Sequence, residues 1–150
     1  MSRHVVRVEW QADGGFREGR YSRAHRWRFD GGAEVLASSS PTVVPEPMSD
    51  PAGVDPEEAL LASASSCHLL WFLHVARDAG FDVASYADDA QATLGRDERG
   101  RMSVTRITLR PKIAFTGEGP DAATLARLHD EAHERCFIAN SLRSEIVVEA

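Results

Sequence analysis

The chain has 150 residues, a length typical of one domain, and 43% of them are hydrophobic while 27% are charged. This balance excludes an intrinsically disordered chain. The 23 acidic residues outnumber the 17 basic ones, giving a formal net charge of −6. With no run of Lys or Arg, that charge argues against a general binder of nucleic acid or of anionic membrane surfaces.

The first third of the sequence has the pattern of strands. We expect strands over His4–Trp10, Arg20–Phe29 and Glu34–Ser38, separated by the turn signals Gly14-Gly15 and Asp30-Gly31-Gly32. The three strands together predict an antiparallel meander.

The next segment, Ser38–Pro56, holds five of the seven prolines and is therefore expected to be extended and irregular. It could be a linker or an arm packed against the domain. We favour the packed arm, because the segment leads directly into the most apolar helix and long irregular loops are uncommon in compact domains.

A long helix is predicted from Pro56 to Asp78, with Asp55 as its cap and Gly80 as its terminator. Cys67 lies on the apolar stripe of this helix. The middle of the helix is apolar nearly all round, so we expect its own sheet or a second chain to cover it. The polar side chains within Ala59–Ala76 argue against a membrane span: Ser63, Ser65, Ser66, His68 and His74.

The second half reads as two strands, a helix and a final strand. The strands are Val83–Leu94 and Ser103–Phe115, joined by a charged hairpin at Arg96–Arg101. Pro120-Asp121 opens the second helix, whose apolar stripe ends at Cys136. The chain leaves this helix over Phe137–Leu142, and Glu145–Glu149 forms the last strand. The order βββ-α-ββ-α-β predicts an α+β fold with two main helices packed on antiparallel sheets.

The two cysteines, Cys67 and Cys136, are the first candidates for chemistry. They are too few for a secreted disulfide framework and form no Cys-X-X-Cys motif. Without an apolar signal core in Met1–Gln11, we expect a soluble, cytoplasmic protein with reduced thiols. Both could point into one interior, as packing residues or as a redox pair, and spacing alone leaves both open. Hydroxyls at Ser63, Ser65 and Ser66 would suit a thiolate at Cys67.

The sequence offers weaker support for a metal site, a phosphate-binding site or a hydrolase site. His129 and His133 are spaced i, i+4, but Asp130 follows the first histidine, so we expect solvated histidines rather than a metal site. Arginines of the first third are expected on a solvated face, with one free to pair with Glu57 or Glu58: Arg17, Arg20, Arg23, Arg26 and Arg28. No Gly-rich phosphate loop or Gly-x-Ser-x-Gly elbow is present.

Two motifs resemble the OsmC/Ohr family of osmotically inducible and organic hydroperoxide resistance proteins. Asp55–His68 (DPEEALLASASSCH) is similar to the family's Asn-Pro-Glu segment leading to Ala-Ala-Cys. Glu134–Ser141 (ERCFIANS) resembles the second cysteine and the loop that follows it. The resemblance covers residues 1–150 as a single OsmC/Ohr-like domain.

The resemblance implies an intertwined homodimer that reduces organic hydroperoxides. Cys67 matches the peroxidatic cysteine, Cys136 the resolving one and Glu57 the carboxylate of the Pro-Glu motif. The active-site arginine falls on Arg23, with Arg20 the next choice. The reductant would be an external dithiol, for which the lipoyl type is one candidate. No metal or cofactor would be required.

From this resemblance we expect Glu57 to orient Arg23 through a bidentate pair. We also expect Trp71, Phe72 and Phe137 to line an apolar cleft that favours organic peroxides.

Departures from the family pattern leave an alternative open. Asp55 replaces the family's Asn, no arginine lies near Pro47, and His68–His74 is unusually bulky. These features fit a distinct subgroup with altered substrate or weak activity. The alternative is a non-catalytic, dimeric small-ligand-binding protein on the same fold.

Overall fold

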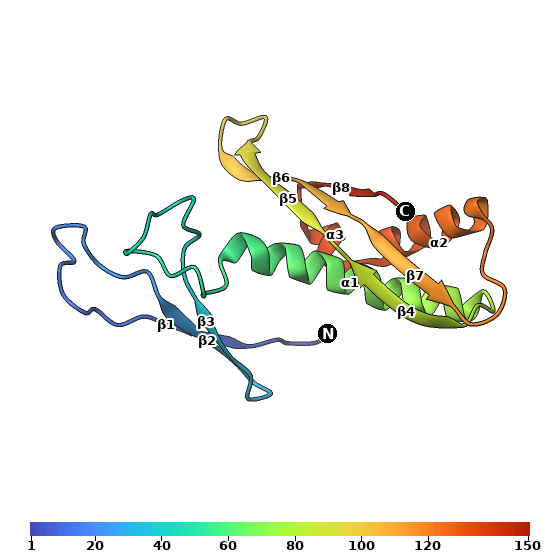
Figure 1. Cartoon of the computed structure of the whole chain (residues 1–150), viewed down its shortest axis with the longest axis horizontal. Helices are drawn as coiled ribbons and strands as arrows, with labels where there is room; N and C mark the ends of the chain where they lie inside the picture. The colour runs from blue at the N-terminus through green and yellow to red at the C-terminus, as the bar shows by residue number, and fades with distance from the viewer. The chain divides into compact units, whose positions relative to one another are not determined.

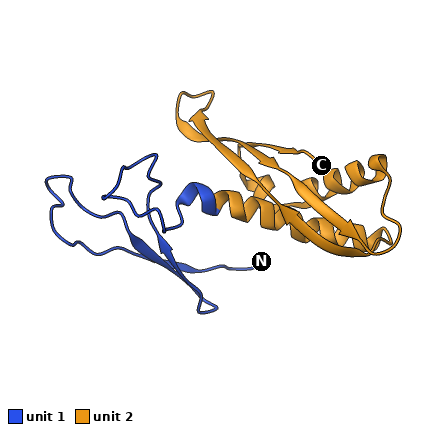
Figure 2. Ribbon diagram, in the orientation of Figure 1, with its two compact units in different colours: residues 1–59 blue, residues 60–150 orange.

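The structure, a computed structural model, describes residues 1–150 as two units, residues 1–59 and residues 60–150 (Figure 2). Unit 1 has one sheet and unit 2 has two. Figure 1 labels the helices and strands in chain order.

Unit 1 contains an antiparallel sheet in the order β1-β2-β3. Its strands are β1 (Val6–Glu9), β2 (His25–Phe29) and β3 (Glu34–Ala37). Trp27 in β2 lies opposite Val8 and Val35, which places these three apolar side chains on one face. The predicted meander is confirmed, with shorter strands than the sequence pattern suggested.

The proline-rich segment after β3 folds back onto that strand as a packed arm. The Val54 amide donates to the Leu36 carbonyl at 2.9 Å, and the Ser38 amide donates to the Val54 carbonyl at 3.1 Å. The Asp50 amide donates to the Ser38 Oγ at 2.9 Å. These bonds confirm the packed arm over the free linker.

Unit 2 has five strands in two sheets: β4 (Val83–Asp88), β5 (Gln91–Arg96), β6 (Met102–Leu109), β7 (Pro111–Phe115) and β8 (Glu145–Val148). The antiparallel pair β4-β7 forms one sheet, and β5-β6-β8 forms the other. The prediction of two unbroken long strands is therefore wrong. The break falls where Asp88 Oδ1 accepts a 2.6 Å hydrogen bond from the Arg110 amide. Strand β8 also runs parallel to β6, where only antiparallel pairing was expected.

Three helices complete the fold, and local signals explain their ends. Helix α1 (Pro56–Asp78) starts at a capping box, in which the Glu58 amide donates to Asp55 Oδ1 at 2.8 Å and the Asp55 amide donates to Glu58 Oε2 at 3.3 Å. Gly80 follows its end with φ +90°. Helix α2 (Ala122–Arg135) is capped by Asp121, and a short helix α3 (Phe137–Ser141) forms where an irregular exit was expected.

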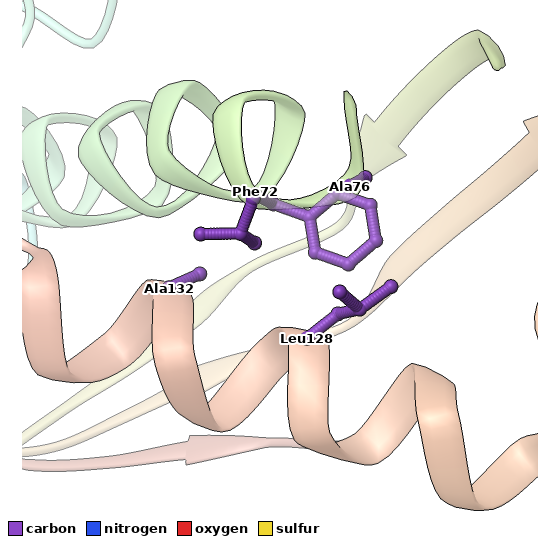
Figure 3. Close-up of a cluster of buried hydrophobic side chains, with 5 residues drawn as sticks. Phe72, Ala76, Leu128 and Ala132 are labelled. Atoms are coloured by element: carbon purple, nitrogen blue, oxygen red, sulfur yellow. The ribbon is translucent and has the colours of Figure 1, made fainter. Parts of the chain in front are cut away.

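The core of unit 2 has two parts, and α1 contributes to both. Its C-terminal half packs on α2 through Phe72, Ala76, Leu128 and Ala132, which point toward one another in Figure 3. Its preceding turns pack through Ala64 on Ile107 and Leu109 of β6. Helix α1 thus joins both sheets of this unit.

One side of α1 stays uncovered within the chain. Leu70 is 63% exposed and Leu73 is 37% exposed. By length and hydropathy α1 would also qualify as a membrane span, a test that core helices of soluble proteins pass as well. The expectation that α1 is covered is therefore met only in part by its own chain.

Candidate active site

The two cysteines lie on different elements of unit 2. Cys67 is in the middle of α1 and is partly exposed, whereas Cys136, between α2 and α3, is 1% exposed. Cys136 ends α2 by donating its amide to the His133 carbonyl at 3.2 Å. Its Sγ accepts a 3.3 Å hydrogen bond from the Ala139 amide, which caps α3.

The side chains of the two cysteines interact with each other. Burial raises the pKa of the Cys136 thiol to about 11, and interaction with the Cys67 side chain contributes to the rise. The Ala139 amide acts in the opposite direction. The structure therefore brings together the two cysteines that the sequence placed on two apolar stripes.

Two aromatic side chains close in sequence to the cysteines contact each other. Trp71, one helical turn after Cys67, meets Phe137 edge-on with ring centroids 5.5 Å apart. Phe137 is 69% exposed. The Arg135 guanidinium lies 5.7 Å from the Trp71 ring centroid and forms an ion pair with Glu131 at 2.6 Å.

Phe72 is fully buried in the contact between α1 and α2. The expectation that Phe72 lines an apolar cleft is therefore wrong. Of the three residues expected there, Trp71 is half-buried and Phe137 is exposed.

The serine hydroxyls before Cys67 serve other partners. Ser63 Oγ donates to the Leu60 carbonyl at 2.7 Å, as is common for serine within a helix. Ser65 Oγ donates to Asp88 of β4. The expectation that these two hydroxyls support a Cys67 thiolate is wrong.

Arg23 and Glu57, both in unit 1, are not paired with each other. The Arg23 guanidinium donates to the Tyr21 carbonyl at 2.7 Å and lies 3.6 Å from the Tyr21 ring centroid. Its amide is held by the Met48 carbonyl at 2.9 Å. Glu57 lies in the first turn of α1, and the ion pairs of the chain include neither residue.

A buried pair of histidines lies near the cysteines. His68 Nε2 and His129 Nδ1 are 3.0 Å apart, and their rings stack with an angle of 9° between the planes. The expectation of a solvated His129 is wrong, since this residue is 3% exposed. Its position directly after Leu128 on the apolar stripe of α2 was the available signal. No group of three or more metal-binding side chains converges in the structure.

Burial keeps both histidines neutral. It lowers the pKa of His68 to about 4, assisted by His129 and His133 and opposed by Asp88. Burial also lowers the pKa of His129, opposed by Asp130 and Asp88. Near neutral pH the pair therefore holds one N–H and one lone pair in its shared hydrogen bond.

Comparison with known proteins gives relatives of one kind. The peroxiredoxin OsmC of Escherichia coli K12 is 27% identical over 97 residues, which make up 65% of this chain and 66% of that protein. An OsmC-like protein of unknown function from Vibrio cholerae O1 biovar eltor is 48% identical, with a TM-score of 0.96 over 99% of both chains. The organic hydroperoxide resistance protein OhrB of Bacillus subtilis shares the fold, with a TM-score of 0.64 and 21% identity over 97% of this chain and 95% of that one.

The family assignment follows from the sequence of the second and larger part of the chain. Residues 49–150, more than half of the chain, match the family described as OsmC-like protein. This segment includes α1, both cysteines and all of unit 2. The mixed fold with antiparallel sheets and two main helices agrees with the solved structures. The chain therefore belongs to the OsmC-like protein family.

Proposed function

We propose that this protein is a thiol-dependent peroxidase that reduces organic hydroperoxides to alcohols. The observation that carries the proposal is the adjacency of Cys67 in the middle of α1 to Cys136 at the junction of α2 and α3. The printed names of its relatives, a peroxiredoxin and an organic hydroperoxide resistance protein, support the same class of reaction.

The reaction needs two thiols and an external dithiol. The Cys67 thiolate attacks one peroxide oxygen and the O–O bond breaks, leaving a sulfenic acid on Cys67 and an alkoxide that takes a proton to become the alcohol. The Cys136 sulfur then attacks the sulfenic sulfur, forming the disulfide and releasing water. A dithiol, of the lipoyl type among others, is oxidised as it returns both cysteines to thiols.

Burial supports this division of roles between the cysteines. Because the pKa of Cys136 is raised to about 11, its sulfur is protonated near neutral pH and is a poor nucleophile toward peroxide. Cys67 is the more exposed of the two and can be reached by a substrate. Trp71, one helical turn after Cys67, and Phe137, which contacts Trp71, offer apolar rings that suit an organic peroxide.

The cation in the mechanism is assigned to Arg23, with Arg20 as the next choice. Its guanidinium would stabilise the Cys67 thiolate and polarise the peroxide, and Glu57 would orient it through a bidentate pair. This role requires the Arg23 guanidinium to exchange its bond with the Tyr21 carbonyl for one with Glu57.

The proposal extends to the setting of the protein. We infer an intertwined homodimer, formed from single-domain chains of residues 1–150, that works in the cytoplasm without metal or cofactor. Its partners are the hydroperoxide and the dithiol reductant, and we expect no nucleic acid or membrane partner.

Thiol titration after one equivalent of cumene hydroperoxide tests the proposal. Both thiols of each chain should be lost and one intramolecular disulfide should appear by mass. C67S should abolish alcohol formation, whereas C136S should still react once and retain a trappable sulfenic acid. R23A should slow the reaction far more than R20A. Persistence of both thiols in the unaltered chain would leave the non-catalytic ligand-binding protein as the better account.

A further inference from the structure

The His68–His129 contact is the one side-chain hydrogen bond between α1 and α2. Both residues are nearly fully buried, at 2% and 3% exposure. Neither residue has a part in the peroxide chemistry described above. Burying a polar pair of this kind costs desolvation free energy. We therefore look for its role in the specificity of helix packing rather than in stability.

Apart from the Arg135 guanidinium 5.7 Å from the Trp71 ring centroid, the remaining contact between α1 and α2 is mainly apolar. Phe72 and Ala76 of α1 meet Leu128 and Ala132 of α2 as a cluster of carbon atoms (Figure 3). Apolar burial is non-directional, so these contacts specify the alignment of the two helices less sharply than a hydrogen bond does. A hydrogen bond loses strength steeply with angle and distance, so the histidine pair fixes the register of the two helices.

This register governs the approach of the two sulfurs. His68 directly follows Cys67 on α1, and His129 lies on α2, about two turns before Cys136. A shift of α2 along α1 would move the Cys136 sulfur relative to Cys67 by a similar amount. Disulfide formation tolerates little displacement, because the geometry of the bond is narrow.

Burial, the largest cause of the lowered pKa of both histidines, keeps the pair neutral near neutral pH, and the charged and titratable groups around it act in both directions. His133 of α2 disfavours a proton on His68, whereas Asp88 of β4 and Asp130 of α2 favour protonation within the pair. Tyr86 of β4, whose buried hydroxyl has no partner, also packs against Phe72, and burial raises its pKa. Two protons on the pair would place two cations 3.0 Å apart in a buried site.

We propose that His68 and His129 are positioning residues for the cysteine pair: their shared hydrogen bond sets the register of α1 against α2 and thereby the approach of Cys67 to Cys136. The inference rests on the proposed function only in taking the Cys67–Cys136 disulfide as a functional state.

Four amide substitutions form a reciprocal test. The bond uses Nε2 of His68, which a glutamine amide can replace, and Nδ1 of His129, which an asparagine amide can replace. H68Q and H129N therefore keep a polar atom near the required position. H68N and H129Q are equally polar but move that atom by about one bond length along the side chain.

The measurement is the equilibrium between the Cys67–Cys136 disulfide and dithiothreitol in defined ratios of its oxidised and reduced forms, with no peroxide present. We expect H68N and H129Q to lower the equilibrium constant for disulfide formation about tenfold, the scale of one lost buried hydrogen bond. H68Q and H129N should stay within about threefold of the unaltered chain. H74Q, at an exposed histidine of α1 paired with Asp78, serves as the matched control.

The results for the variants and for the unaltered chain together distinguish failure of this proposal from failure of the peroxidase proposal. If all four variants have the equilibrium constant of the unaltered chain, the positioning role is overturned and the peroxidase proposal is left intact. An equal decrease of the equilibrium constant in all four variants would also overturn the positioning role. A purely structural role predicts this result, because it makes no difference between asparagine and glutamine at one position. If the unaltered chain does not form the disulfide, both proposals are overturned. This outcome is seen with the unaltered chain alone.

Discussion

At the scale of single residues, burial makes two different side chains in or next to the cysteine pair neutral. It lowers the pKa of His68 to about 4 and raises that of Cys136 to about 11. One is a base that resists gaining a proton, and the other is an acid that resists losing one. Between these values the interior of α1 and α2 carries no charge from either group.

The titration of His68 predicts how stability depends on pH. In the unfolded chain histidine has a pKa of about 6.5, so that state binds more protons than the folded state between about pH 6.5 and 4. The free energy of unfolding should therefore fall as pH decreases through this window, by at most about 3 kcal/mol from this group. Urea unfolding between pH 7 and 4.5 measures the effect. H68Q lacks the titrating ring and should lose less stability over the same range, and equal slopes would contradict the prediction.

Some site residues were predictable from sequence, and others depend on distant partners. Apolar stripes on two helices placed Cys67 within α1 and Cys136 at the end of α2, although Cys67 is only half-buried. His129 was predicted to be solvated. Its partner His68 lies on another helix, so the spacing of residues within α2 does not reveal the pair. Ser65 was assigned to Cys67, but its hydroxyl donates to Asp88, a residue that approaches only when the strands of unit 2 have formed.

At the scale of elements, the sequence predicted best what local signals control. The start of α1 at Asp55 and its end before Gly80 are encoded within a few residues. The break between β4 and β5 was missed, because alternating residues continue up to Asp88 and the corner forms by pairing with Arg110. Pro111, which lacks an amide donor, was the one local signal of that corner.

The close approach of the packed arm to β3 predicts a site that tolerates no side chain. A Cβ at Gly53 would lie 2.9 Å from the Ala37 carbonyl carbon and from the Ser38 amide nitrogen and Cβ. We expect G53A to lower the free energy of unfolding by about 1–3 kcal/mol through overpacking. G31A is the matched control, since a Cβ at Gly31 meets nothing within 4 Å. Denaturant unfolding of both variants tests the difference, and similar values for the two would show that the arm yields without cost.

At the scale of the whole molecule, exposed apolar side chains indicate which surface a second chain would cover. Leu70 of α1 is 63% exposed, and Phe137 of α3 is 69% exposed. The sequence predicted a helix apolar nearly all round, and unit 2 covers only part of it. The proposed homodimer would account for the rest.

A charge introduced at Leu70 tests the dimer. L70D would place a carboxylate in the proposed interface, where desolvation opposes burial, and should shift the protein from dimer to monomer. L94D is the control, because Leu94 is 42% exposed but lies on β5 rather than α1. Sedimentation velocity distinguishes the two species. A monomeric unaltered chain, or a dimer insensitive to L70D, would contradict this account.

The Ala139 amide, which donates a hydrogen bond to the Cys136 sulfur, is a natural NMR probe of the chemical state of that sulfur. Removing the thiol hydrogen, or bonding that sulfur to Cys67, alters its electron density and therefore the shielding of this amide. The NMR resonance of the Ala139 amide, observed with isotope labelling of the backbone and no attached dye, should therefore differ between the dithiol and the Cys67–Cys136 disulfide.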